Sequence, residues 1–194
     1  MKMLIGLTGR TGSGKSSAAK IFEDLGCFVA DCDKVAHKVL LDDEIKNKLC
    51  SLFNEDILNK ENEIDRKKLG TIVFSDKEKL TLLNGIVHKA IVQKCLELCE
   101  NSGRDICLMD GSELESSGAD ELCKYIVVIT ADEETRLKRI MQRDGIDKDS
   151  ALRRIHAQSD YSKAAIYVDN GGNEEELRKK ITSLYDQFSG EINV

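Results

Sequence analysis

The sequence predicts an α/β fold built on a five-stranded parallel sheet, and three observations support this. Short apolar runs of strand length alternate with segments that carry apolar residues at helical spacing. The first run, residues 3–8, leads through a glycine-rich turn into a helix at 15–25, and a second strand follows at 27–31. A strand–helix–strand unit of this kind builds parallel sheets. The chain of 194 residues is long enough for one such core.

Three later apolar runs complete the predicted sheet. They lie at 106–109, ending at Asp110, at 125–129 and at 165–168. The pattern therefore predicts five parallel strands with helices on both faces of the sheet.

Helix starts are marked by polar residues at capping-box spacing. Ser75 with Glu78 predicts the start of a long helix, and Asn173 with Glu176 predicts the start of a final helix at 174–188.

The order of elements predicts a single domain with two helical additions. The core is expected at about 1–34, 104–135 and 159–194, a helical insertion at about 35–103, and a basic helical lid at about 136–158. The segment 136–154 carries a net charge of +4 within a chain of net charge −6, because seven Lys and Arg residues face three Asp residues there.

Composition narrows the class of protein. The chain is 41% hydrophobic and 33% charged, and it has no uncharged apolar run near the roughly 20 residues that a membrane span requires. A net charge of −6 argues against nucleic acid as a partner, since such proteins carry a basic face. Seven cysteines without CxxC spacing predict reduced thiols with neither disulfides nor a zinc site. Residues 1–7 are expected to form a first strand and not a signal peptide, so the expected location is the cytosol. Oligomeric state is not predicted.

A phosphate-binding loop lies between the first strand and the first helix. Residues 9–16, GRTGSGKS, match G-x-x-x-x-G-K-[ST] in full and in the expected strand–loop–helix context. Backbone amides and the helix N-terminus would bind the phosphates of ATP, the Lys15 ammonium would reach the β and γ phosphates, and the Ser16 hydroxyl would ligate Mg²⁺. The residues expected to contact ATP in this loop are Gly12, Ser13, Gly14, Lys15, Ser16 and Ser17.

The loop alone leaves the reaction open. The N-K-x-D motif by which GTPases bind their base is lacking, and the chain is small, so a kinase of small metabolites fits best. The acceptor of such a kinase could be a small hydroxyl compound or a nucleotide. A non-catalytic protein that binds ATP is the alternative from a different class.

Two carboxylates follow the second strand. Strand periodicity would place Asp31 and Asp33 on one side of the chain, at the sheet edge where ligands bind. One would accept the proton of the attacking hydroxyl, and the other would hold Mg²⁺ through water. Alternatively, Asp33 caps the helix that starts at Lys34.

Three arginines in the lid segment follow helical spacing. Arg136, Arg139 and Arg143 would share one helix face, where guanidinium groups suit the charge of a phosphoryl group in transfer, or they would form a solvated face. In the insertion, Arg66 and His88 would contact an anionic acceptor or serve a structural role.

The sequence resembles the dephospho-coenzyme A kinase family along nearly its whole length. The resemblance rests on IGLTGRTGSGKSSAAKIFEDLGCFVADCDKVAHKVL, IDRKKLGTIVFSDKEKLTLLNGIVH, LKRIMQRDG and YVDNGG. It implies a three-layer P-loop kinase fold and transfer of the ATP γ-phosphate, with Mg²⁺, to the ribose 3′-hydroxyl of dephospho-coenzyme A. This reaction is the last step of coenzyme A synthesis.

The resemblance also implies roles for single residues. It places the general base at Asp33, the lid arginine at Arg143, and adenine near the lid and Asn170-Gly171, with Arg139 among the ATP contacts. The acceptor is expected to contact Thr8, Asp33, Arg66, His88 and Asp110.

One segment departs from the family pattern. Residues 111–117 are polar and acidic where the family has an apolar stretch, and Glu113 and Glu115 would repel a phosphorylated acceptor unless a lysine or arginine pairs with them. Lys67, Lys68 and Lys89 are candidates for that pairing.

Overall fold

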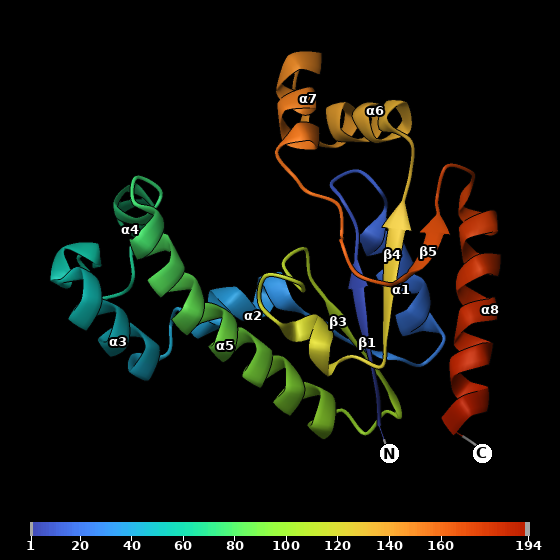
Figure 1. Ribbon diagram of the computed structural model, residues 1–194, viewed down its shortest axis with the longest axis horizontal. Helices are drawn as coiled ribbons and strands as arrows, with labels where there is room; N and C mark the ends of the chain where they lie inside the picture. Colours follow the sequence, from blue (N-terminus) through green and yellow to red (C-terminus); the bar gives the residue numbers. More distant parts are fainter. Residues whose placement is uncertain (1, 193–194) are drawn as a thin grey trace. The chain divides into compact units, whose positions relative to one another are not determined.

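The computed structural model describes residues 2–192 and divides the chain into two compact units (Figure 1). Unit 1 comprises Met1–Ala30 and Cys99–Val194, and unit 2 comprises Asp31–Leu98. The sheet and the phosphate-binding loop belong to unit 1, and most of the predicted helical insertion belongs to unit 2. No helix in the described part of the chain is long and apolar enough to cross a membrane.

A five-stranded sheet forms the centre of unit 1, as predicted. Its strands are β1 (Met3–Thr8), β2 (Phe28–Asp31), β3 (Ile106–Asp110), β4 (Tyr125–Thr130) and β5 (Ile166–Asp169). Their order is β2-β3-β1-β4-β5, with β1 paired in parallel to β3 and β4, and β4 paired in parallel to β5. The registers Leu7 to Asp110 and Thr8 to Val128 bring the carboxyl ends of the three central strands to one edge. Ligands of parallel α/β folds bind at this edge.

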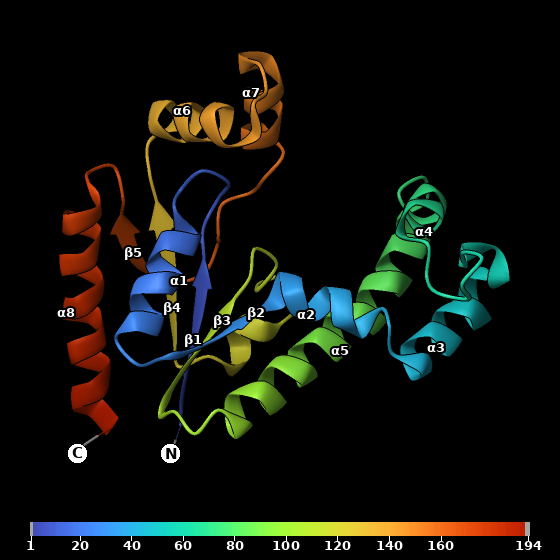
Figure 2. The same ribbon diagram turned by 180° about the vertical axis from the view of Figure 1, so that it is seen from behind.

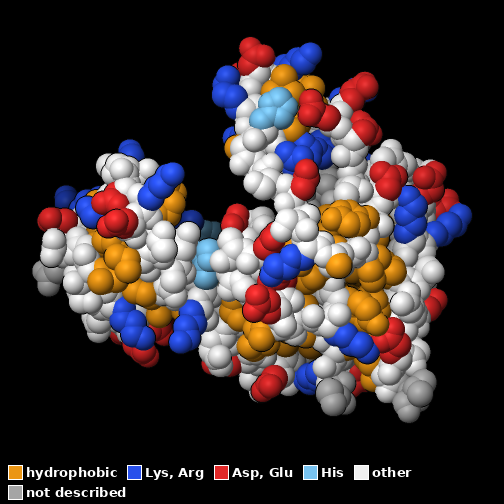
Figure 3. All heavy atoms as spheres, viewed as in Figure 1, with side chains coloured by type: hydrophobic (Ala, Val, Ile, Leu, Met, Phe, Trp, Pro, Cys, Tyr) orange, Lys and Arg blue, Asp and Glu red, His pale blue; other side chains and the backbone are white. Residues whose placement is uncertain are grey.

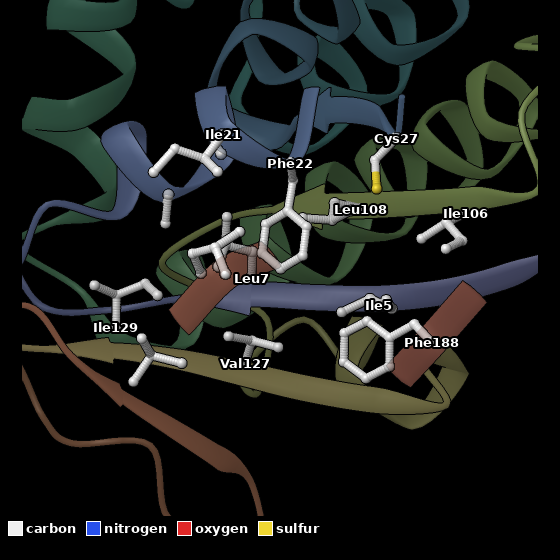
Figure 4. Packing of buried hydrophobic residues seen from close by; sticks show 14 of the residues in the cluster. Ile5, Leu7, Ile21, Phe22, Cys27, Ile106, Leu108, Val127, Ile129 and Phe188 are labelled. Carbon is white, nitrogen blue, oxygen red and sulfur yellow. The ribbon is translucent and has the colours of Figure 1, made fainter. Parts of the chain in front are cut away.

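Two helices cover one face of the sheet. Helices α1 (Lys15–Asp24) and α8 (Glu174–Ile192) contact each other and pack on that face, as both views of the ribbon show (Figure 2). Phe22 of α1 and Phe188 of α8 are fully buried with Ile5 and Leu7 of β1 (Figure 4). The other face is covered in unit 1 by the connection after β3, where Leu114 lies under Gly6, and by the short 3-10 helix η2 (Ala119–Leu122).

The lid helices α6 (Glu133–Asp144) and α7 (Lys148–His156) stand at the end toward which β1, β4 and β5 point (Figure 1). They have a small core of their own, in which Ile140, Ala151 and Ile155 are buried. Gly145 ends α6 in the left-handed conformation at φ 64°, which allows the chain to turn into α7.

Unit 2 is entirely helical apart from an isolated bridge between Leu58 and Ile64. Its helices are α2 (Cys32–Val39), α3 (Asp43–Phe53), η1 (Glu55–Ile57), α4 (Arg66–Val73) and α5 (Lys77–Asn101), whose end extends into unit 1. Leu49, Phe53, Ile57 and Val73 form part of its buried interior.

The structure corrects three local predictions and confirms one. Strand β2 ends at Asp31, and Asp33 lies in the first turn of α2, so the two carboxylates do not share a strand face. The cap of α2 is Asp31, whose carboxylate accepts the Lys34 amide at 2.9 Å; Asp33 is not the cap. The long helix α5 is likewise capped by Asp76, which accepts the Glu78 and Lys79 amides, and not by Ser75. The predicted pairing of Asn173 with Glu176 is present.

Candidate active site

The loop between β1 and α1 requires glycine at two positions for steric reasons. Gly12 and Gly14 have φ values of 79° and 90°, which L side chains rarely adopt. A Cβ at Gly12 would lie 2.8 Å from the Arg136 carbonyl oxygen, and one at Gly14 would collide with the Asn170 side-chain amide. The glycines therefore let the lid helix α6 and the turn after β5 approach the loop backbone closely.

The N-terminus of α1 is suited to bind an anion. Gly14 precedes the helix in a left-handed conformation, no side chain caps the helix, and its first turn holds no acidic residue. The Ser17 and Ala18 amides donate to the Gly14 carbonyl oxygen, which leaves the Lys15 and Ser16 amides at the positive end of the helix dipole. Ser16 and Ser17 are exposed at the same end.

Lys15 is joined to Asp110 across the sheet edge. Its ammonium forms an ion pair with the carboxylate at the end of β3, and the two side chains are only 17% and 10% exposed. The parallel register explains this contact, because Leu7 of β1 lies opposite Asp110. Asp110, which the sequence associates with the acceptor, thus lies at the lysine of the phosphate loop.

Arg139 and Asn170 fasten the loop from two sides. The Arg139 guanidinium donates to the carbonyl oxygens of Gly12 and Ser13, both at 3.4 Å, and to that of Asn170 at 2.9 Å. The buried Asn170 amide donates to the Ser13 carbonyl at 2.7 Å. The structure therefore brings together four of the residues that the sequence assigns to ATP, with Gly171 directly after Asn170.

Arg143 is held within the lid. Its guanidinium binds both carboxylate oxygens of Asp144, at 2.7 and 2.9 Å, and Arg154 binds the same carboxylate. These contacts lower the pKa of Asp144, with the Arg143 hydrogen bond as the main cause, and raise the pKa of Arg143. The three lid arginines thus have different surroundings, although helical spacing predicts one shared face.

A cavity of about 690 Å³ opens beside the loop, within unit 1. Its walls come from the start of the loop, the connection after β3, the ends of β4 and β5, and both ends of the lid. Residues that line it include Thr8, Arg10, Ser13, Glu113, Glu115 and Arg136. Figure 3 shows basic side chains at the base of α6 and α7, next to the body of the unit.

The two glutamates of the departing segment contact hydroxyl groups. Glu113 accepts the Ser116 hydroxyl at 2.6 Å, and Glu115 accepts both the amide and the hydroxyl of Ser162. The Ser162 bonds lower the pKa of Glu115. The two carboxylates are thus bound by hydroxyl and amide groups within unit 1, whereas the sequence suggests lysine partners for them.

Four predicted site residues lie in unit 2. Asp31 caps α2, Asp33 lies exposed in its first turn, Arg66 is the exposed first residue of α4, and His88 is half-buried on α5. Asp31 also pairs with the Lys34 ammonium at 3.0 Å.

Sequence reasoning missed the contacts between the loop and the end of the lid. Arg10 donates to the carbonyl oxygens of Ile155 and Gln158 and pairs with Asp160 at 3.1 Å. The Thr11 amide donates to the Gln158 side chain at 2.6 Å. Both loop residues occupy variable positions of the motif, and their partners lie more than 140 residues away, so no local pattern indicates them.

Comparisons with known proteins identify the family. The family model described as dephospho-CoA kinase matches residues 3–176. Two curated proteins named dephospho-CoA kinase are similar over nearly their whole length. One, from Fusobacterium nucleatum, is 38% identical over 92% of this chain and 95% of its own; the other, from Bacillus licheniformis, is 33% identical over 97% and 98%.

Solved structures agree with this result. Dephospho-CoA kinase from Campylobacter jejuni superimposes with a TM-score of 0.71 and 31% identity, covering 98% of this chain and 99% of its own. A Thermus thermophilus protein has a TM-score of 0.79 and 26% identity, covering 96% and 97%. With the family model, the curated relatives and the fold in agreement, the chain belongs to the dephospho-CoA kinase family.

Proposed function

We propose that this chain transfers the γ-phosphate of ATP to the ribose 3′-hydroxyl of dephospho-CoA. The bond that forms joins the 3′-oxygen to the γ-phosphorus, and the bond that breaks joins this phosphorus to the oxygen bridging the β and γ phosphates. The hydroxyl proton passes to a protein base, and the products are CoA and ADP. The observation that carries this proposal is the family match over residues 3–176, with the phosphate loop intact inside it.

Lys15 would neutralise charge on the β and γ phosphates. A lysine at this loop position reaches the transferred group, and the amides at the start of α1 would bind the phosphate oxygens. Bound phosphates would compete with Asp110 for the ammonium. The low exposure of the Lys15 side chain, 17%, supports this role, since a charge with little solvent interacts strongly with a bound anion.

We assign proton acceptance to Asp33, because Asp31 caps α2. The Asp31 carboxylate is occupied by the Lys34 amide and ammonium. Asp33 is exposed, and within the described residues its carboxylate makes no hydrogen bond or ion pair. A carboxylate without such contacts is available to accept the proton of a bound hydroxyl.

The oxygen donors at this site suit Mg²⁺. The ion is usually held by one or two carboxylates, a hydroxyl and the substrate phosphates, and does not need a cage of protein ligands. The exposed Ser16 hydroxyl lies at the start of α1, and the Asp110 carboxylate at the end of β3 pairs with Lys15, the residue before Ser16. When bound, the ion would neutralise charge on the β and γ phosphates. Ser16 would hold it, with Asp31 or Asp33 acting through water as further candidates.

The nucleotide side of the site would include Arg139, Asn170 and Gly171. The bonds of Arg139 and Asn170 to the loop carbonyls support this placement, because they fix groups of the lid and of the turn after β5 next to the phosphate cradle. Arg143 would leave Asp144 when the lid closes and place its guanidinium on the phosphoryl group in transfer.

The acceptor contacts that the family resemblance implies are Thr8, Asp33, Arg66, His88 and Asp110, and we propose these residues as the acceptor-binding set. We further propose that the enzyme works in the cytosol without a nucleic acid or membrane partner. Its seven free thiols and net charge of −6 support this location and these exclusions.

An acceptor panel tests the proposal. ADP release is measured with Mg²⁺ and ATP in the presence of dephospho-CoA, nucleosides, nucleoside monophosphates or shikimate. Of the acceptors in the panel, we expect only dephospho-CoA to cause ADP release. Release should occur at dephospho-CoA concentrations of roughly 1 μM to 1 mM, the usual range of KM. Release with another member of the panel would show a different acceptor, and ATP binding without release would show a non-catalytic protein.

A further inference from the structure

Arg136 is a buried arginine without a protein partner. It lies in the first turns of α6 and is 5% exposed, and its Nε atom is fully buried without a hydrogen bond. Across residues 2–192 its guanidinium makes no hydrogen bond or ion pair. Burial, followed by the nearby charge of Arg10, lowers the pKa of Arg136.

Such a group is costly in a folded protein. A guanidinium stays charged at any physiological pH, and a buried charge without a partner loses its hydration without compensation. The other arginines that contact the loop or lie on α6 all have partners: Arg10 binds Asp160, Arg139 binds loop carbonyls, and Arg143 binds Asp144. Arg136 is therefore a buried charge at this site that has no partner among residues 2–192, and a bound anion would supply one.

A second unpartnered donor faces the same space. The Ser13 side chain is 1% exposed, and its hydroxyl is also buried without a hydrogen bond. Both Ser13 and Arg136 line the cavity of about 690 Å³. A guanidinium and a hydroxyl on two residues that line the same cavity suit an oxyanion, for which arginine provides a fork of donors.

The acidic residues of the cavity wall do not supply this partner, because each is held by another donor. The pairs are Glu113 with Ser116, Glu115 with Ser162, Asp160 with Arg10, and Glu133 with His156. Glu133 and Asp160 act on Arg136 only as distant charges.

The position of the cavity indicates which substrate supplies the anion. The phosphates of ATP are expected at the end of the loop, where Lys15 and Ser16 start α1; of the residues that the sequence assigns to ATP, only Ser13 lines the cavity. The cavity is lined instead by the start of the loop and by the connection after β3. We infer that Arg136 and Ser13 form an anion subsite for the diphosphate group of the acceptor. This inference rests on the proposed function.

The test compares Arg136→Gln with Lys138→Gln, a matched loss of one charge from the same helix. Lys138 is exposed and pairs only with Glu134. Binding is measured by calorimetry on the full chain with three ligands: a non-hydrolysable ATP analogue, then dephospho-CoA and adenosine with the analogue present. Adenosine carries the ribose hydroxyls without the diphosphate.

We expect Arg136→Gln to weaken dephospho-CoA binding by about tenfold to a hundredfold, the usual effect of losing a charged hydrogen bond. Binding of the ATP analogue and any binding of adenosine should stay within about twofold, and Lys138→Gln should match the wild type throughout. Equal weakening of adenosine and dephospho-CoA, weakening of the ATP analogue alone, or unchanged dephospho-CoA binding would each overturn the inference.

Thermal unfolding without ligand separates this result from misfolding. Removal of an uncompensated buried charge should leave the melting temperature of Arg136→Gln equal to or above that of the wild type. A lower melting temperature would show that Arg136 stabilises the fold and would overturn the subsite. If the wild type binds dephospho-CoA but does not phosphorylate it, the proposed reaction is wrong. The comparison of dephospho-CoA binding by Arg136→Gln and the wild type still tests the subsite in that case.

Discussion

Replacing Asp110 by Asn should destabilise the protein by an amount that ATP partly restores. The change leaves the Lys15 ammonium, whose side chain is 17% exposed, without its carboxylate partner. Breaking a buried ion pair costs about 3–5 kcal/mol. Because both side chains retain some exposure and Asn keeps an acceptor oxygen, we expect about 3 kcal/mol. For a chain of this size, that corresponds to a fall in melting temperature of about 6–12 °C.

The assay is thermal unfolding with and without saturating Mg²⁺ and ATP. Bound phosphates would become the new partner of Lys15, so ATP should raise the melting temperature of Asp110→Asn more than that of the wild type. Asp120→Asn is the control, because it removes a buried carboxylate that pairs at 2.7 Å with Lys163, whose side chain is 44% exposed. It should lose less stability, since Lys163 stays solvated, and should show no extra gain from ATP. Equal ATP shifts in all three proteins, or an unchanged melting temperature for Asp110→Asn, would refute the competition between Asp110 and the phosphates.

Four further substitutions and one titration test the site. Lys15→Ala should weaken ATP binding and abolish turnover, and near-normal turnover in a folded variant would contradict the loop assignment. Asp33→Asn should keep ATP binding and lower kcat by about 10²-fold or more, whereas Asp31→Asn should leave kcat and stability nearly unchanged, because asparagine caps a helix as well as aspartate does; equal kcat losses would leave the base unassigned. Arg143→Ala should lower kcat more than it weakens ATP binding, and an unchanged kcat would exclude a role in transfer. Since Arg143 and Arg154 depress the pKa of Asp144, its stabilising contribution should be complete above about pH 4 and be lost as pH falls further. Acid unfolding of wild type and Asp144→Asn should therefore converge below that pH, and a constant difference would argue against the pair.

Elements with strong periodicity could be predicted from the sequence. All five strands, the position of α1 and the pairing of Asn173 with Glu176 agree with prediction, because buried strands and local caps depend on neighbouring residues. The alternative that Asp33 caps α2 is wrong because the strand ends at Asp31, and helix boundaries depend on a balance that spacing alone does not determine.

The surroundings of the lid arginines could not be predicted. Helical spacing gives Arg136, Arg139 and Arg143 equivalent directions. In the structure Arg139 binds loop carbonyl oxygens, Arg143 binds Asp144, and Arg136 has no partner among residues 2–192. These differences depend on how α6 packs over Gly12. Contacts between residues distant in sequence, such as Arg10 with the end of the lid, leave no local signal.

The most direct test of the proposed reaction is the identity of the product made from ATP and dephospho-CoA. Phosphorus NMR and mass spectrometry of the reaction mixture should show one equivalent of ADP and a new phosphomonoester on the ribose 3′-oxygen, with neither formed by Lys15→Ala. A phosphate at any other oxygen of the acceptor, or ADP formed without a phosphorylated acceptor, would contradict the account.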